Sequence, residues 1–175
     1  MLPEQFTNRM KELLKEEYED FTACYGNDHA HSLRINPLKG TKEQYDQTSV
    51  FKEREPLKEQ IAWEENGFYY EDSLQPGKHP FHEAGVYYIQ EASAMAPAAW
   101  LPIKPGDRVL DLCAAPGGKS TELAAKLTGT GVLFSNDISN SRAKALLKNL
   151  EMFGAGSNLK DKSDEEIFYQ DFKKF

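Results

Sequence analysis

The sequence has little cysteine, no long apolar run and no excess of positive charge. Its two cysteines, Cys24 and Cys113, are too few for a disulfide framework and fit a reducing cytoplasm. No apolar stretch is long enough to span a bilayer, and the charged N-terminus lacks the apolar core of a secretory signal. A net charge of −7 argues against a protein that coats nucleic acid by charge alone, but it leaves room for local RNA recognition by a basic cleft.

The first part of the chain predicts a small α+β arrangement. Residues 4–25 predict a helix that ends near Gly26, because apolar side chains recur at roughly helical spacing: Phe6, Met10, Leu13, Leu14 and Phe21. The stretch "HSLRIN" alternates apolar and polar residues and predicts a short strand. "EQIAWEENGFYYE" predicts two strands with a turn at Asn66-Gly67, and "GVYYIQ" predicts another strand before a small-residue helix around 93–100.

From Arg108 onward the order strand, helix, strand, helix predicts a βαβ unit with parallel strands. The strands are expected over 108–113 and in "GVLFSND", and the helices in "KSTELAAKLTGTG" and "SNSRAKALLKNLEMFG". The second helix is expected to end at Gly154 and to bury one face, made of Ala143, Leu146, Leu147, Leu150 and Phe153.

The C-terminal segment departs from this scheme because no third apolar strand follows. Ser163 and Glu166 form a capping box, and Phe168, Phe172 and Phe175 share one helical face. A sheet of two or three strands leaves apolar surface uncovered, so we expect this short helix or a partner chain to cover it.

The loop "CAAPGGKS" between the first parallel strand and its helix has the geometry of a ligand site. Main-chain N–H groups point outward at a helix N-terminus, and Gly117 and Gly118 let a ligand approach the backbone closely. Asp137 ends the second strand about twenty residues further on, where an acid accepts hydrogen bonds from ribose in this architecture. Loop and acid together predict a nucleoside-containing cofactor.

The identity of the cofactor follows from what the loop does not contain. Neither G-x-G-x-x-G nor G-x-x-x-x-G-K-[ST] is present, so a pyrophosphate cradle is not expected. This favours S-adenosylmethionine over NAD, and a purely structural βα turn remains the alternative without a ligand.

The motif "DLCAAPGGKS" resembles the cofactor-binding motif of the Nop/Sun family of RNA cytosine-5 methyltransferases, in particular its bacterial RsmF-like ribosomal RNA enzymes. "YYIQEASAMAP", "SNDIS" and "LRIN" resemble other motifs of the same family, and the similarity extends to about Gly154. The resemblance implies an α/β fold: a truncated Rossmann-like methyltransferase sheet preceded by a small α+β N-terminal domain. It also implies S-adenosylmethionine as cofactor and RNA, ribosomal RNA first, as substrate.

The resemblance assigns domains and site residues. It implies an RNA-binding-type domain over 1–80, the cofactor-binding part of a methyltransferase domain over 81–156, and an atypical helix over 157–175. The expected cofactor loop consists of Cys113, Ala114, Ala115, Pro116, Gly117, Gly118 and Lys119. Asp137 matches the ribose acid, and Arg142 matches a position that sometimes contacts the cofactor.

The chemistry of the family requires a thiolate that adds to carbon 6 of cytosine before the methyl group is transferred to carbon 5. The family carries its working cysteines in a Pro-Cys and a Thr-Cys segment, and neither segment occurs in this sequence. We therefore expect no catalytic residue here and an inactive chain on its own, in the cytoplasm. The alternative is a non-catalytic remnant that retains affinity for cofactor or RNA. Cys24 is expected to be a small, partly buried residue.

Other polar residues admit two interpretations each. Arg34, Lys39 and Lys42 are expected either to touch RNA phosphates or to form surface salt bridges. The pairs His29/His31 and His79/His82 lack further ligands nearby, so no metal site is expected.

Overall fold

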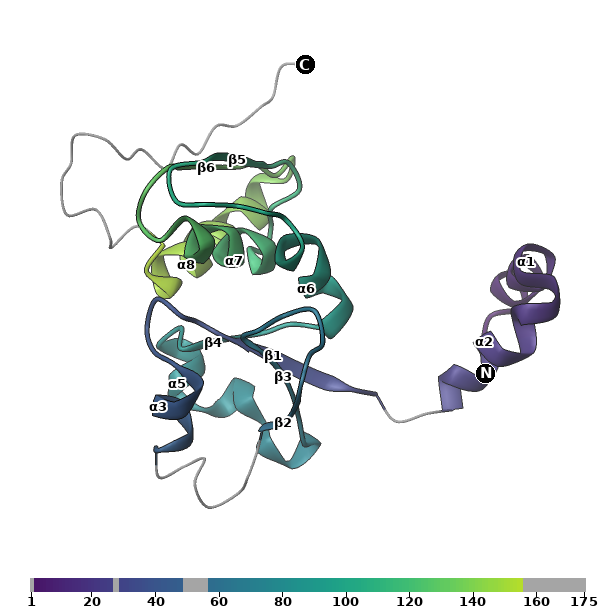
Figure 1. Ribbon diagram of the computed structural model, residues 1–175. Coiled ribbons are helices and arrows are strands. Elements are labelled where there is room, and N and C mark those ends of the chain that lie inside the picture. Colours follow the sequence, from purple (N-terminus) through teal and green to yellow (C-terminus); the bar gives the residue numbers. More distant parts are fainter. Residues whose placement is uncertain (1, 27–28, 49–56, 156–175) are drawn as a thin grey trace. The chain divides into compact units, whose positions relative to one another are not determined.

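The computed structural model of the protein describes residues 2–26, 29–48 and 57–155 (Figure 1). The chain divides into two compact units, Met1–Ala30 and His31–Phe175. The helix predicted around 163–175 lies outside the described residues. Among the helices in the described ranges, none combines the length and the apolar character needed to cross a membrane.

The first unit is helical, but its predicted single helix is broken. It contains α1 (Glu4–Leu14) and α2 (Tyr18–Ala23), separated by a 3-10 turn at Lys15–Glu17. The break follows from Lys15, whose φ of 50° lies outside the helical region. Phe21 contacts Phe6 and Tyr25, at ring-centroid distances of 6.3 and 5.4 Å. Cys24 is exposed, so its predicted partial burial is wrong.

The second unit begins with a four-stranded antiparallel sheet in the order β2-β3-β1-β4. Its strands are β1 (His31–Ile35), β2 (Leu57–Gln60), β3 (Gly67–Tyr70) and β4 (Tyr87–Ile89). The predicted pairing of β2 with β3 is confirmed, but their connection is a six-residue loop rather than a turn at Asn66-Gly67. Gly67 already belongs to β3, because the Glu64 carboxylate accepts a hydrogen bond from the Asn66 N–H and closes the turn earlier in the chain.

Strand β1 buries both of its faces. Leu33 and Ile35 pack into an apolar core with Tyr45 of α3 (Lys42–Asp46), Phe68 and Tyr87, and α5 (Pro80–Glu83) adds Phe81 to it. The alternate residues Ser32, Arg34 and Asn36 are also buried. The sequence alternation therefore predicted a two-faced strand correctly, but the polar face meets protein rather than water.

Helices α6 (Ala92–Ala99), α7 (Gly118–Leu127) and α8 (Asn140–Phe153) lie on that polar face of the antiparallel sheet (Figure 1). The Asn36 amide donates to the carbonyl oxygens of Gly85 and Phe153, at 2.8 and 2.9 Å. The Lys39 amine donates to the carbonyl of Met152 at 2.6 Å and to that of Ala84. Polar side chains from β1 and the following turn thus anchor the C-terminal end of α8.

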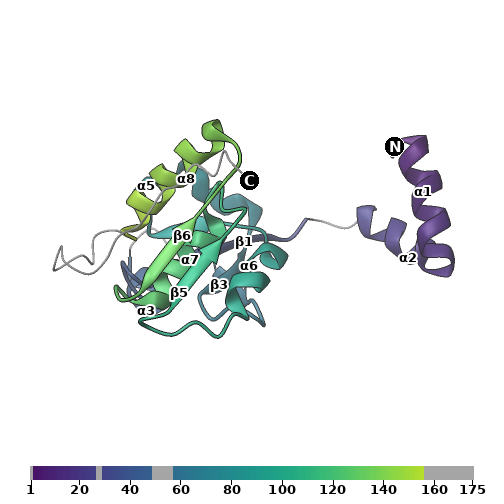
Figure 2. The same cartoon turned by 90° about the horizontal axis from the view of Figure 1, so that it is seen from above.

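Strands β5 (Arg108–Asp111) and β6 (Val132–Ser135) form the predicted parallel pair, with Leu110 opposite Phe134. Figure 2 shows the two strands side by side with α7 beneath them. Leu123 and Leu127 of α7 pack against Leu133 and Val109, together with Ala98 of α6. The βαβ unit expected from the sequence is confirmed.

The opposite face of the β5–β6 pair carries exposed apolar side chains. Leu110 and Leu112 are both more than half exposed, and within the described residues no helix covers this face (Figure 1). Parallel sheets are ordinarily covered on both faces. The predicted helix with Phe168, Phe172 and Phe175 lies outside the described residues, so its proposed covering role stays a prediction.

Helix α8 offers a matched test of core packing. Leu150 is 1% exposed and packs on Leu146, Ala114 and Ala115, whereas Leu147 is 37% exposed, so the predicted burial of Leu147 is wrong. We expect Leu150→Ala to lower the free energy of unfolding by about 2–5 kcal/mol, because it leaves a cavity beneath the loop. Leu147→Ala should lower it by less than about 1 kcal/mol. Urea titrations followed by circular dichroism measure both, and equal losses would contradict this account.

Candidate cofactor-binding site

The loop between β5 and α7 brings the predicted residues together at the carboxyl end of β5. Ala114 and Ala115 are buried, Cys113 and Pro116 are exposed, and Lys119 is half-buried. The Ala115-Pro116 peptide bond is cis. Gly117 precedes the first residue of α7 with a φ of 118°, a conformation that L side chains rarely adopt, so glycine is required there.

Side chains and main chain from three elements hold the carbonyl groups of this loop. Arg142 and Asn149 of α8 donate to the carbonyls of Ala115 and Pro116, both at 2.7 Å. The Thr121 N–H donates to the Gly117 carbonyl at 2.8 Å, and the Arg34 guanidinium of β1 donates to the Gly118 carbonyl at 2.7 Å. With four successive carbonyls engaged by protein, the path of the loop is fixed.

The N-terminus of α7 differs from those of the neighbouring helices. In the part of the chain that the structure describes, no side chain caps this ten-residue helix. By contrast, Thr41, Glu91 and Ser139 cap α3, α6 and α8 with side-chain hydrogen bonds. The first N–H groups of a helix have no acceptor within it, and the helix dipole adds partial positive charge. The arrangement suits a polar or anionic group of a ligand.

Asp137 follows β6 and contacts the loop directly. Its carboxylate accepts hydrogen bonds from the N–H groups of Ala115 and Ser139, at 3.2 and 3.0 Å, and lies 3.3 Å from the Arg142 guanidinium. The Asp137 side chain is 2% exposed, whereas the Arg142 side chain is 57% exposed. The predicted acid and the predicted arginine therefore meet at the loop and brace it.

Three buried polar residues that sequence reasoning missed align the strand ends. The Ser120 hydroxyl donates to the Asp111 carboxylate at 2.7 Å and lies 3.0 Å from the Ser135 hydroxyl. This network joins the last residues of β5 and β6 to the first turn of α7. The available signal in the sequence was the polar residue that follows an apolar stretch at the end of each strand, Asp111 in β5 and Ser135 in β6.

Exposed apolar side chains lie beside the site. Ile138, directly after Asp137, is 91% exposed, and Leu112 follows β5 with its side chain mostly in solvent. Sequence reasoning did not single out Ile138, because its position directly after Asp137 carries no pattern.

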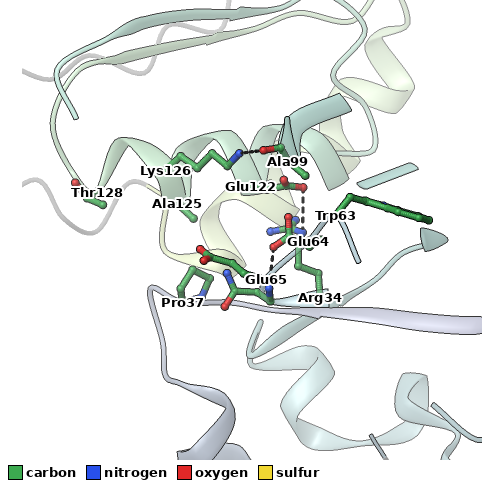
Figure 3. A pocket seen from close by; sticks show the side chains of 11 residues that line it. Arg34, Pro37, Trp63, Glu64, Glu65, Ala99, Glu122, Ala125, Lys126 and Thr128 are labelled. Atoms are coloured by element: carbon green, nitrogen blue, oxygen red, sulfur yellow. Dashed lines mark hydrogen bonds and ion pairs between the residues drawn. The ribbon is translucent and has the colours of Figure 1, made fainter. Parts of the chain in front are cut away.

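A hollow of about 500 Å³ lies between the β2–β3 loop and the face of α7 and holds a buried charge cluster (Figure 3). The Arg34 guanidinium Nε lies 3.4 Å from the Glu122 carboxylate, and Glu64 is buried nearby. Arg34 is 1% exposed, so both predictions for it, RNA contact and a surface salt bridge, are wrong. The polar face of β1 meets α7, which sequence periodicity alone did not reveal.

The charge cluster contains more buried carboxyl groups than guanidinium groups. Burial raises the pKa of Glu122 from its ordinary 4.5 to about 8; the Arg34 guanidinium opposes the rise and Glu64 adds to it. Because burial disfavours the charged form, Glu122 keeps its proton in the folded state to a higher pH than in the unfolded chain.

This raised pKa predicts a pH dependence of stability. From about pH 4.5 to about pH 8 the folded chain holds a proton that the unfolded chain has released, so the free energy of unfolding falls as pH rises. The Glu122 contribution is fully present below that window and lost above it, with a slope of at most about 1.4 kcal/mol per pH unit. Glu122→Gln should remove this component, as urea midpoints across the window would measure. A slope identical to that of the unmodified chain would contradict the assignment.

Three of the remaining polar candidates, Lys42, His31 and His79, have local partners. Lys42 forms an ion pair with Asp46 one helical turn away, and His31 lies 3.4 Å from the Asp72 carboxylate. The His79 ring nitrogen accepts a hydrogen bond from the Phe81 N–H. Within residues 2–26, 29–48 and 57–155, no three His, Cys, Asp or Glu side chains gather as a metal site would require.

A glycine loop between a parallel strand and its helix, with an acid after the next strand, defines the class of Rossmann-like proteins that bind nucleoside cofactors. Comparison of the sequence with known protein families narrows this class. Residues 2–92 match the N-terminal domain of 16S rRNA methyltransferase RsmF, and residues 98–173 match 16S rRNA methyltransferase RsmB/F. The chain therefore belongs to the RsmB/F, or Nop/Sun, family of ribosomal RNA methyltransferases, whose members use S-adenosylmethionine.

Curated relatives agree with this family. The chain is 37% identical over 174 residues to ribosomal RNA small subunit methyltransferase F of Vibrio cholerae, covering 95% of this chain and 36% of the relative. It is 35% identical over 154 residues to the protein of the same name from Shewanella amazonensis, covering 86% of this chain and 32% of the relative. The chain thus spans about a third of the length of these relatives.

Solved structures share the fold. A methyltransferase homologue protein from Pyrococcus horikoshii superposes with a TM-score of 0.75 at 26% identity, covering 97% of this chain and 53% of that chain. NSun6 from the same organism, solved with SFG, gives a TM-score of 0.75 at 16% identity over 97% of this chain and 65% of that chain. The resemblance and the α/β fold expected from the sequence are confirmed.

Proposed function

We propose that the loop from Cys113 to Lys119 binds S-adenosylmethionine and that the chain is the cofactor-binding part of a ribosomal RNA cytosine-5 methyltransferase. The observation that carries this proposal is the uncapped, glycine-bearing N-terminus of α7 beside Asp137. A site for an adenosyl group needs main-chain donors, a ribose acceptor and an apolar surface. All three occur within this loop and the residues directly after β6.

Asp137 is the proposed ribose acceptor. An ionised carboxylate offers about four acceptor positions, of which the Ala115 N–H, the Ser139 N–H and Arg142 use three. A ribose hydroxyl would take the remaining position or displace the largely exposed Arg142. Ile138 would contact the adenine ring, since its side chain is almost entirely in solvent.

The cofactor supplies an activated methyl group when bound, and the chain supplies its orientation. Methylation at carbon 5 also needs a thiolate that adds to carbon 6 and a base that removes the carbon 5 proton. Cys113 lies within the cofactor loop and Cys24 belongs to the other compact unit, so neither is assigned as the nucleophile. We therefore propose that these 175 residues alone transfer no methyl group. The substrate proposed from the relatives is ribosomal RNA in the cytoplasm, with residues 1–80 as the RNA-binding-type domain.

Calorimetric titration of the 175-residue chain with S-adenosylmethionine and, separately, with NAD tests the cofactor assignment. Saturable heat is expected with S-adenosylmethionine only. Saturable heat with NAD alone would replace the assignment with that of a dinucleotide enzyme, and no heat with either would refute cofactor binding. Incorporation of labelled methyl into ribosomal RNA by this chain would overturn the proposed inactivity.

A further inference from the structure

Arg34 connects the antiparallel sheet to the start of the cofactor loop helix. It stands on β1, yet its side chain is fully buried against α7, more than eighty positions away in the sequence. Burying a guanidinium is costly unless it is paired and hydrogen-bonded. The groups that the Arg34 guanidinium contacts therefore indicate its role in the fold.

The guanidinium contacts the first turn of α7 at three points. Its Nη2 donates to the Gly118 carbonyl at 2.7 Å and to the Thr121 hydroxyl at 2.9 Å, while Nε lies 3.4 Å from the Glu122 carboxylate. The planar fork of arginine fixes the relative direction of these contacts, which a lysine amine does not. The Glu122 contact joins β1 to α7, but the Nη2 contacts reach the residue that begins the helix.

Gly118 is the position where fixing the backbone matters most for a ligand. The Gly118 carbonyl and the Lys119 N–H share one peptide plane, so holding that carbonyl holds the direction of the Lys119 N–H in the first turn of α7. Gly118 is also confined by the Gln90 amide, whose atoms would lie 3.1–3.3 Å from an added Cβ. The loop is thus supported from beneath by side chains of β1 and of the segment before α6.

We propose that Arg34 is a positioning residue for the cofactor: its Nη2 contacts hold the first turn of α7 in the orientation in which the main-chain N–H groups bind S-adenosylmethionine. This inference rests on the proposed function, because it concerns the same site. It differs from a purely structural role, in which the Arg34–Glu122 contact only holds β1 against α7.

A double variant separates the two roles. Arg34→Met with Glu122→Leu replaces both buried polar partners by apolar groups, an exchange that often leaves stability unchanged. We expect thermal unfolding close to that of the unmodified chain, but calorimetric affinity for S-adenosylmethionine about tenfold weaker, because hydrogen bonds to a charged group are lost. Arg34→Lys keeps the charge without the planar fork, so its affinity for S-adenosylmethionine should lie between that of the unmodified chain and that of the double variant.

Lys126→Met is the matched control on the same helix. The Lys126 amine donates to the carbonyls of Ala98 and Ala99, both at 2.6 Å, so it also joins α7 to another element, but at the far end from the loop. We expect this variant to lose stability and to bind S-adenosylmethionine within about twofold of the unmodified chain, since the first turn is untouched.

The cofactor-free chain gives an independent readout. Amide-hydrogen exchange at Gly118, Lys119 and Ser120 should be faster in Arg34→Lys and in the double variant, and unchanged in Lys126→Met. Unmodified affinity and unmodified exchange in the double variant would overturn the positioning role. Absence of S-adenosylmethionine binding by the unmodified chain would instead refute the proposed function, while the exchange data would still decide whether Arg34 orders this turn. If the double variant does not fold, the same measurements on Arg34→Lys decide the question.

Discussion

Replacing Asp137 with alanine should weaken binding of S-adenosylmethionine by about a hundredfold. The change removes a charged acceptor proposed for the ribose, and each hydrogen bond to a charged group contributes about 1.5–3 kcal/mol. It also removes the acceptor of the Ala115 N–H within the loop and the partner of the Arg142 guanidinium. Isothermal titration calorimetry measures the affinity, and thermal unfolding measures the accompanying loss of stability.

Asp107→Ala is a suitable control for this experiment. The Asp107 carboxylate accepts a hydrogen bond from the Lys104 N–H at 2.8 Å, so it also stabilises a turn, but at the other end of β5. Its loss should reduce stability while leaving affinity within about twofold. Affinity of Asp137→Ala equal to that of the control would remove Asp137 from the site.

Gly117→Ala should impair both the loop and its ligand. With a φ of 118°, an alanine there is strained, at a cost of about 1–3 kcal/mol in the free energy of unfolding. The added Cβ would also lie 3.3 Å from Leu146 and 3.4 Å from Asn149, whose amide holds the Pro116 carbonyl. Because the loop must move to relieve this crowding, we expect affinity for S-adenosylmethionine to fall by about tenfold or more.

Gly106→Ala is the control that separates the effect of backbone strain from the effect of a change within the cofactor loop. Gly106 also has a positive φ, of 90°, but no atom lies within 4 Å of its would-be Cβ, and it precedes β5 rather than following it. The variant should show a comparable loss of stability and unchanged affinity. If Gly117→Ala loses stability but binds as tightly as Gly106→Ala, the main chain of the loop is not the ligand contact.

Local patterns in the sequence predicted most of the elements and the site loop. Periodicity in α8 found Leu146, Leu150 and Phe153, and apolar runs found β5 and β6 as a parallel pair. These features depend on neighbours in the chain and on the chemistry of glycine, which a sequence displays directly. The position of Asp137 beside the loop followed from the shared edge of parallel strands.

Long-range burial of polar groups could not be predicted in this way. The polar face of β1 looks like a solvated face, because Ser32, Arg34 and Asn36 alternate with apolar residues. Their partners are Gln90, directly after β4, and residues of α7 and α8, and nothing in the local pattern indicates that pairing. The break at Lys15 was missed for a different reason: lysine does not ordinarily adopt a positive φ.

The anchoring of the last turn of α8 has a consequence for how the loop can open. Helix ends ordinarily fray, but the carbonyls of Met152 and Phe153 are held by Lys39 and Asn36 from the antiparallel sheet. The same helix holds the loop through Arg142 near its N-terminal end and through Asn149 one turn before its C-terminal end. Unwinding α8 from its C-terminal end, the end nearer Asn149, therefore requires its contacts with the antiparallel sheet to break first, which couples release of the Pro116 carbonyl to separation of the helix from the sheet.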